Sequence, residues 1–329
     1  MKPLQTPRET THSRRHTASI NMLFARPSVV VAATALTCAG LVLFARWRRR
    51  LHRPAPSLPR AHVVSLARFP AARAAVLRRA AAAGLKDVQI FEAVDGRELS
   101  TAELTRQGVK AYPGWKLTGT GFRFFDRDLK WGEVGCALSH VGVWRRIAAE
   151  SDQPVAVVLE DDVDFAPRFA ELVLEALAQI QQLVADGTIE APDALYLGRK
   201  AMRPEHDRVL PRPASRDGHA ASSVRLLVPG FSYKTTAYIL WRSGAEKLLR
   251  SGYEGKLIPV DDFLALTYAP HEAKAGVARA DLDELFADAP RLKMLAVRPN
   301  LCWERRGISS TENSAFITEE SRRAPMPKT

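Results

Sequence analysis

Two clusters of neighbouring carboxylates in this 329-residue chain follow short apolar runs and could carry chemistry. In "PVAVVLEDDVDF", Glu160, Asp161 and Asp162 come directly after an apolar run, and Asp164 follows one residue later. Like charges at adjacent positions repel one another, and partial burial strengthens the repulsion and raises the pKa of each carboxyl. Three explanations remain open at this point: a solvated strand end, a cap for the following helix, or ligands for a cation.

The second cluster is the pair Asp261 and Asp262 in "IPVDDF", where Pro259 restricts the preceding backbone. A carboxylate held in this way can act as a general base that takes the proton of a hydroxyl nucleophile. The alternative is that the pair caps the helix expected over "FLALTY".

A histidine lies close behind the second cluster. His271 in "APHEAK" could complete a metal site, because a neutral imidazole is a competent ligand. Hard cations prefer oxygen, however, so an exposed loop histidine is the alternative reading.

The segments that must position these residues alternate between strand and helix patterns. Continuous apolar strands of this kind predict an α/β domain with a mostly parallel, twisted sheet and helices on both faces. Ligands in such sheets bind beyond the carboxyl ends of the strands, and residues 160–162 lie at such an end, which favours the cation. Strands are expected at 61–67, 88–94, 155–159 and 194–198, helices at 71–83, 132–150 and 169–184, and a strand leading into a helix at 235–249.

The net charge of +12 is concentrated at one end of the chain. Residues 1–60 contain eleven Lys and Arg residues and a single acidic residue, Glu9, so residues 61–329 carry a net charge of only +2. The globular part therefore has no basic excess suited to a phosphate backbone, and we expect no nucleic-acid partner.

The uncharged run at residues 28–45 divides the chain into five expected regions. Its length is at the short end of what spans a bilayer, and arginines rather than a cleavage site follow it, so a signal anchor is expected. The alternative is a transit peptide that directs the chain to an organelle and is then removed. The regions are a basic N-terminal tail (1–27), a transmembrane signal anchor (28–45), a basic, proline-rich stem (46–60), a catalytic domain (61–315) and a flexible tail (316–329).

The topology of the expected anchor is ambiguous in the sequence. Arginines are denser after the span than before it, which by the positive-inside rule keeps the following domain in the cytosol. The function expected below instead places that domain in the lumen of the endoplasmic reticulum or Golgi. Cysteines do not decide the compartment, since Cys136 and Cys302 outside the span allow at most one disulfide.

Several motifs in a fixed order resemble glycosyltransferase family 25, which includes bacterial lipooligosaccharide galactosyltransferases and animal procollagen galactosyltransferases. The resemblance runs from about Ala61 to Ser314. The motifs are "VVSLARFPAARAAVLRRAAAAGL", "FEAVDGREL", "GEVGCALSHVGVWRRI", "VVLEDDVDF", "YLGRKAM", "SYKTTAYILWRSGAEKLL", "IPVDDFLALTY" and "SSTENS".

The resemblance implies a GT-A-like fold, a UDP-sugar donor (UDP-galactose by analogy), a divalent cation such as Mn²⁺, and inversion at the anomeric carbon. The acceptor would be a hydroxyl group on a protein or glycan, such as a hydroxylysine. A hard cation held by carboxylates stabilises the diphosphate leaving group, and the same cation would relieve the repulsion among residues 160–162.

The resemblance also implies roles for individual residues. Asp162 is expected to bind the metal with Glu160 or Asp161 in support, while His271 is a further candidate ligand and Asp164 ranks lower. Of the pair Asp261 and Asp262, Asp261 is expected to be the base. Contacts to the donor nucleotide are expected from Ser65, Leu66 and Arg73.

Two polar residues on an apolar helix leave a choice open. Ser139 and His140 in "GEVGCALSH" could contact the uridine or the acceptor, or could satisfy buried backbone groups.

Two rival classes remain. One is a non-catalytic adhesion or scaffold protein on a transferase-like fold, which the retained carboxylates disfavour. The other is a metal-dependent phosphohydrolase or nucleotidyltransferase, which would usually need a nucleophile or a glycine-rich phosphate loop that the sequence lacks.

Overall fold

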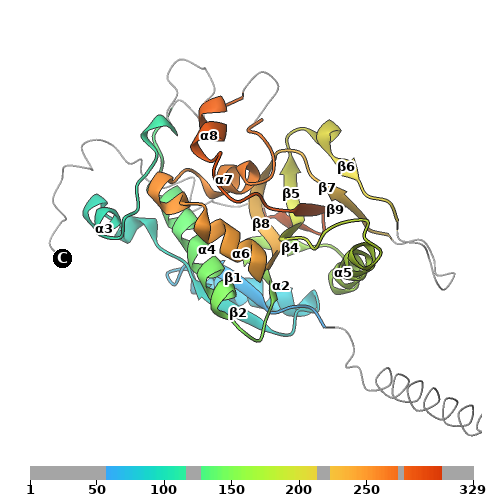
Figure 1. Ribbon diagram of the computed structural model, residues 1–329. Coiled ribbons are helices and arrows are strands. Elements are labelled where there is room, and N and C mark those ends of the chain that lie inside the picture. The colour runs from blue at the N-terminus through green and yellow to red at the C-terminus, as the bar shows by residue number, and fades with distance from the viewer. Residues whose placement is uncertain (1–56, 116–126, 213–222, 273–277, 306–329) are drawn as a thin grey trace, which may run out of the picture. The chain divides into compact units, whose positions relative to one another are not determined.

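The computed structural model describes residues 57–115, 127–212, 223–272 and 278–305, and these form a layered α/β domain (Figure 1). Its strands are β1 (Ala61–Ser65), β2 (Val88–Glu92), β3 (Val155–Glu160), β4 (Val163–Phe165), β5 (Ala194–Ala201), β6 (Arg208–Val209), β7 (Arg225–Val228), β8 (Ser232–Trp241), β9 (Met294–Arg298) and β10 (Cys302–Glu304). Its α-helices are α2 (Pro70–Ala82), α3 (Thr101–Arg106), α4 (Trp131–Ala149), α5 (Phe169–Ala185), α6 (Arg242–Arg250), α7 (Val260–Leu266) and α8 (Ala280–Leu285). The expected catalytic region 61–315 contains all of these elements.

The central sheet has eight strands in the order β2-β1-β3-β8-β5-β9-β7-β6. The pairs β1/β2, β1/β3 and β5/β9 are parallel, whereas β8 is antiparallel to both β3 and β5. At the far edge β7 is antiparallel to β9 and to β6. It follows that β7 and β8 oppose the other six strands, and the expected mostly parallel α/β sheet is confirmed in strand direction.

Helices cover both faces of the sheet, as expected from the apolar strands. Alternate residues of β3 point to opposite faces: Val158 packs with α4, α6 and α7, while Val157 packs with α2 and α5. Both side chains are fully buried. Each face therefore carries its own hydrophobic core, and together the two cores hold the strand ends in place.

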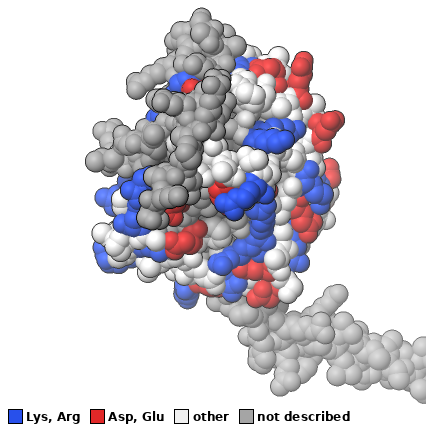
Figure 2. All heavy atoms as spheres, turned by 90° about the vertical axis from the view of Figure 1, so that its left-hand side faces the viewer, with Lys and Arg blue, Asp and Glu red and all other residues white. Residues whose placement is uncertain are grey.

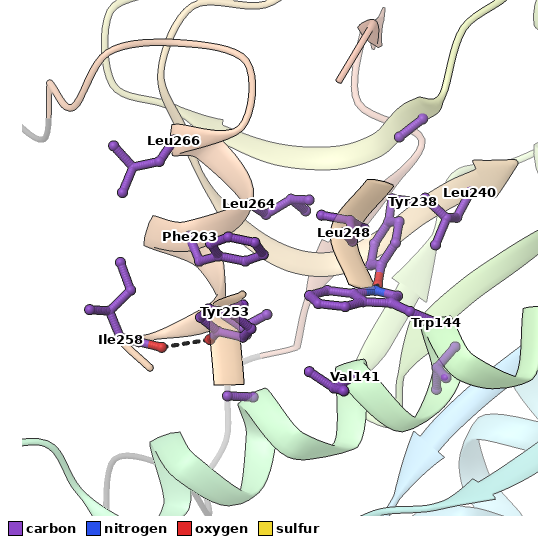
Figure 3. Packing of buried hydrophobic residues seen from close by; sticks show 14 of the residues in the cluster. Val141, Trp144, Tyr238, Leu240, Leu248, Tyr253, Ile258, Phe263, Leu264 and Leu266 are labelled. Carbon is purple, nitrogen blue, oxygen red and sulfur yellow. Dashed lines mark hydrogen bonds between the residues drawn. The ribbon is translucent and has the colours of Figure 1, made fainter. Parts of the chain in front are cut away.

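The core beneath α4 is built from interlocking aromatic rings (Figure 3). Tyr253 and Phe263 stack with their centroids 3.9 Å apart, and Trp144 of α4 lies tilted against both rings. The hydroxyl of Tyr253 donates to the carbonyl of Ile258 at 2.6 Å, just before α7 begins. Burying three aromatic side chains contributes several kcal/mol, and here it fixes α7 relative to α4.

A glycine lets α4 lie close to the chain that follows β2. A Cβ atom at Gly135 would lie 2.6 Å from the carbonyl oxygen of Val94. That separation is too short for any side chain, so Gly135 sets how closely α4 approaches this segment.

Within the described part of the chain, no helix combines the length and apolarity needed to cross a bilayer. The expected anchor at residues 28–45, with the tail 1–27 and most of the stem, lies outside the described residues. Figure 2 shows basic and acidic side chains interspersed on one face of the domain.

Candidate active site

The carboxylate cluster lies where β1 and β3 end side by side. Val64 pairs with Glu160 in the parallel register, so Ser65 and Asp161 are the next residues on the two strands. Glu160 ends β3, and Asp161 and Asp162 form the turn into β4. The structure therefore brings the expected donor-binding serine and the expected metal ligands to one edge of the sheet, as parallel strands require.

Asp161 is held by protein groups on both its side chain and its backbone. The hydroxyl of Ser65 donates to Asp161 Oδ2 at 2.6 Å. Arg79 of α2 donates to the carbonyl oxygens of Asp161 and Val163, each at 2.8 Å. Burial raises the pKa of the Asp161 carboxyl, and the hydrogen bond from Ser65 offsets part of that rise. These contacts make Asp161 an organiser of the turn.

Asp162 has a different environment. Its Oδ1 atom is buried and has no hydrogen-bond partner among the described residues. Burial, followed by the negative charges of Glu160 and Glu304, raises the pKa of its carboxyl to about 7. A buried, unpaired carboxylate oxygen costs free energy, and a cation bound there would remove that cost. The residue therefore fits the role of a metal ligand.

Glu160 is tied to β8 and α4. The hydroxyl of Thr235 donates to Glu160 Oε1 at 2.6 Å, and His140 Nε2 lies 3.6 Å from the same oxygen. Burial acts to raise the pKa of Glu160, but the contacts with His140 and Thr235 outweigh it and the pKa falls below its usual value. Glu160 is thus the carboxylate of this cluster that stays ionised most readily.

The second cluster lies at the start of α7. Asp261 Oδ1 accepts from the backbone N–H of the next residue, Asp262, at 3.2 Å, and among the described residues no side chain caps the N-cap position of α7 at Pro259. Burial, followed by repulsion from Asp262, raises the pKa of Asp261 to about 7, while Lys234 acts to lower it. Glu160 also acts on this pKa, so Asp261 belongs to the same electrostatic environment as the end of β3. A carboxyl with a pKa near 7 is suited to general-base work.

Asp262 and His271 form a buried pair beside α7. Asp262 Oδ1 lies 3.3 Å from His271 Nε2, and the backbone N–H of His271 donates to Asp283 at 2.9 Å. Burial raises the pKa of Asp262 to about 7 and lowers that of His271 to about 4. Among the described residues, no three of Glu160, Asp161, Asp162 and His271 bring ligand atoms within 4.8 Å of one another. The ligand role of His271 stays a prediction, and its observed partner is Asp262.

The expected donor-binding residues surround the same strand end. Arg73 donates to the backbone carbonyl of Ser65 at 2.8 Å and forms an ion pair with Glu92 at 2.9 Å. Leu66 follows β1 directly and is partly buried. Ser65 and Arg73 are therefore already engaged by protein groups, and contact with a nucleotide stays a prediction for all three.

The two polar residues of α4 are buried and hydrogen-bonded. Ser139 accepts from the N–H of Val94 at 2.8 Å and donates to the carbonyl of Gly135 at 2.6 Å. His140 Nδ1 contacts the hydroxyl of Tyr238 at 2.9 Å. Ser139 thus satisfies a buried backbone group, which was one of the two expected alternatives, and nothing in the structure tests a contact with uridine.

Sequence reasoning missed Lys234, Thr235 and Glu304. Lys234 has φ +84°, a strained backbone conformation for a residue with a side chain, and forms an ion pair with Glu304 of β10. Its charge acts on Glu160, Asp162 and Asp261. A lone lysine within the apolar run "SYKTTAYILW" was a signal that could have found it. Glu304 carried no such signal.

The carboxylates at the end of β3 lie where ligands bind in α/β sheets, and Asp261 at the start of α7 shares their electrostatic environment. The sequence model described as glycosyltransferase family 25 (LPS biosynthesis protein) matches residues 59–264. The chain belongs to this family, and the expected family relationship is confirmed.

Some of the curated relatives are named as galactosyltransferases, and others are named as inactive family members. The chain is 32% identical to a glycosyltransferase 25 family member of Anopheles gambiae, covering 80% of this chain and 40% of that protein. It is 34% identical to the mouse inactive glycosyltransferase 25 family member 3 (79% and 40%), and 32% identical to the human procollagen galactosyltransferase 2 (71% and 34%). The chain thus spans about two-fifths of the length of these relatives or less.

Among solved structures, mouse xyloside xylosyltransferase 1 matches with a TM-score of 0.25 and 14% identity, covering 71% of this chain and 82% of that one. A likeness this low carries no argument about the reaction.

Proposed function

We propose that the chain is an inverting, metal-dependent glycosyltransferase that moves a sugar from a UDP-sugar to a hydroxyl group. Family membership supports the reaction class. Galactose as the sugar rests on the names of relatives such as the human procollagen galactosyltransferase 2. The observation that carries the proposal is that Asp162, with its open carboxylate oxygen, and Asp261, whose pKa is near 7, are both influenced by the charges of the same neighbours, Glu160 and Lys234.

Asp162 is proposed to bind the divalent cation, Mn²⁺ by analogy. The fit rests on its buried, unpartnered Oδ1 atom, because a carboxylate oxygen is the ligand that a hard cation prefers. When bound, the cation supplies charge that stabilises the departing diphosphate. Asp161 and Glu160, held by Ser65 and Thr235, add negative potential that strengthens cation binding.

Asp261 is proposed to take the proton of the acceptor hydroxyl. Its pKa near 7 lets the carboxylate accept a proton at neutral pH and release it again afterwards. Asp262 is bonded to His271 and is therefore less free to do so. The donor nucleotide is proposed to bind beside the end of β1, with Ser65, Leu66 and Arg73 as its contacts. Ser139 and His140 are further candidate contacts.

The acceptor is proposed to be a hydroxyl on a protein or a glycan, of the hydroxylysine type if this chain acts as the procollagen enzymes are named to do. The proposed location is the lumen of the endoplasmic reticulum or Golgi, with residues 28–45 as the membrane anchor. The alternative function is a non-catalytic scaffold, which the relatives named as inactive favour.

Turnover of UDP-sugars by the purified full chain tests the proposal. We expect UDP release from UDP-galactose that depends on Mn²⁺ and on a hydroxylysine-containing peptide or a glycan acceptor, and that stops when a chelator is added. Inverted stereochemistry of the product would support the mechanism. Binding of UDP and Mn²⁺ without turnover of any UDP-sugar would favour the scaffold, and a chelator-insensitive reaction would contradict the metal role.

A further inference from the structure

Three side chains that commonly bind transition metals meet where α4 crosses the end of β3. Cys136 and His140 are four residues apart on α4, which places them on one face of the helix. Glu160 reaches them from the sheet, and the candidate ligand atoms of all three lie within 4.8 Å of one another. Among the described residues this is the only such group of three.

The imidazole of His140 lacks one of its two expected contacts. The side chain is fully buried, and its Nε2 atom has no hydrogen-bond partner among the described residues. The nearest carboxylate oxygen, Glu160 Oε1, is 3.6 Å away, too far for a hydrogen bond. Buried ring nitrogens are rarely left unpaired, because an unmet hydrogen bond in the interior costs free energy. A ligand between His140, Glu160 and Cys136 would meet this need.

The other ring nitrogen is already oriented. His140 Nδ1 contacts the hydroxyl of Tyr238 at 2.9 Å, and Trp144 Nε1 donates to the same hydroxyl at 2.9 Å. Figure 3 shows Trp144 of α4 pointing toward Tyr238 of β8. Metal-binding histidines commonly have their second nitrogen fixed in this way, which sets the ring orientation and the tautomer. Tyr238 therefore holds the His140 ring in an orientation that leaves Nε2 available to a metal ion.

We propose that Cys136, His140 and Glu160 bind one zinc-type divalent cation, with a water molecule in the fourth position. A thiolate, an imidazole and a carboxylate form a donor set typical of zinc and unlike the all-oxygen sets of Mg²⁺ and Ca²⁺. Cys136 and Glu160 are each partly exposed, which gives the cation and the water a route in. The site shares Glu160 with the carboxylate cluster, but it does not use the open carboxylate oxygen of Asp162 and does not rest on the proposed transfer reaction.

Binding requires one proton to leave. The Cys136 thiol loses its proton to solvent as the sulfur–metal bond forms, and the His140 proton occupies Nδ1, from which it is donated to Tyr238. Without metal, burial and the nearby carboxylates keep the pKa of this thiol well above its usual value. Ligand atoms around tetrahedral zinc lie about 3.3–3.8 Å apart, and the 3.6 Å between His140 Nε2 and Glu160 Oε1 already falls in this range.

Cobalt(II) binding to the metal-stripped full chain tests the site. A thiolate bound to cobalt gives an intense charge-transfer band in the near ultraviolet, and zinc should abolish that band by displacement. Cys136→Ser and His140→Gln should each lose the band. Cys302→Ser is the matched control, since Cys302 is the other free cysteine of the described chain and lies outside the cluster. Tyr238→Phe should weaken zinc binding by about 10–100-fold.

The outcomes separate this site from the transferase site. Asp162→Ala should keep the cobalt–thiolate band, even if it abolishes transfer. Absence of the band in the wild-type chain, or its survival in Cys136→Ser, would overturn the proposal. Melting temperatures of all variants without metal show whether a lost band reflects a lost ligand or a lost fold, and if Cys136→Ser does not fold, His140→Gln decides.

Discussion

His271 Nε2 lies 3.3 Å from Asp262 Oδ1, and both side chains are buried. The pKa of His271 is lowered to about 4 and that of Asp262 is raised to about 7, so at neutral pH the imidazole is neutral and the carboxyl is close to its midpoint. The imidazole stays neutral while the carboxyl alternates between its protonated and ionised forms, and either form of the carboxyl can hydrogen-bond to the ring nitrogen. This contact ties the first turn of α7 to the segment that carries His271.

We expect His271→Ala to destabilise the fold without changing the affinity for Mn²⁺. Removing a buried hydrogen-bond partner costs about 1–3 kcal/mol, which lowers Tm by several degrees in a domain of this size. The matched control is His206→Ala, because the His206 side chain is half exposed and forms an ion pair with Glu272. Melting curves and Mn²⁺ titrations check this, and a large loss of Mn²⁺ affinity would make His271 a metal ligand after all.

Asp261→Asn should lower kcat by about 10²–10⁴-fold with little change in Mn²⁺ affinity. The amide keeps the shape of the side chain and cannot accept the acceptor proton. Rescue of activity by added Mn²⁺ would instead indicate a ligand role. A drop in Tm of a few degrees with kcat preserved would indicate that Asp261 only caps α7. Asp262→Asn is the companion variant, and a larger kcat loss there would move the base role to Asp262.

The rate of sugar transfer should rise with pH across a midpoint near 7. Asp261 works as a base only when it is deprotonated, and burial raises its pKa to about 7, so kcat should be low at pH 5.5 and level off above pH 8. Steady-state rates at fixed, saturating Mn²⁺ and donor measure this. The residual activity of Asp261→Asn should not rise with pH in this way. A wild-type kcat that does not change with pH over the same range would contradict the assignment of Asp261 as the base.

Asp162→Asn should stabilise the metal-free chain at alkaline pH. The folded-state pKa of Asp162 is about 7, above its unfolded value of about 3.9, so the folded state holds the proton more tightly. Stability therefore falls as pH rises from about 4 to about 7, and the penalty is complete above that range. Asparagine is neutral throughout, so its advantage should be largest at pH 8 and vanish near pH 4. Each 1 kcal/mol of relief raises Tm by about 2–4 °C.

Bound Mn²⁺ should make the wild-type chain more stable than Asp162→Asn at alkaline pH. Mn²⁺ should raise the Tm of the wild-type chain in proportion to its binding, while Asp162→Asn should gain little. Differential scanning calorimetry with EDTA and with excess Mn²⁺ measures both halves of the comparison. Equal Mn²⁺ stabilisation of the two proteins would show that Asp162 is not a ligand.

The fold could be predicted from the sequence largely because apolar residues recur with the spacing typical of strands and helices. The expected strands at 61–67 and 155–159 and the expected helix at 169–184 are observed within a few residues as β1, β3 and α5. Ser100, the residue before α3, accepts from the N–H of Glu103 at 3.2 Å, a helix-capping contact typical of serine. The order and direction of the strands could not be predicted, because an apolar strand such as β8 can pair with its neighbours in either direction.

The site was predictable only in part, because some of its contacts join segments that lie far apart in the chain. Adjacent acidic residues such as Asp161 and Asp162 stand out in a sequence, and their strand-end position follows from the α/β pattern. Thr235 and Glu304 reach the cluster through pairings between strands far apart in the chain. The contact of His271 with Asp262 likewise depends on how a loop folds back, which no local pattern specifies.

The antiparallel strand β8 also has a consequence for how the domain unfolds. It alone joins the β2-β1-β3 half of the sheet to the β5-β9-β7-β6 half, and its hydrogen bonds go to both neighbours. Neither half can be withdrawn from the other without breaking a full row of these bonds. The amide protons of Tyr238 and Ile239 should therefore exchange with solvent only through global opening, which makes β8 the last part of the sheet to open.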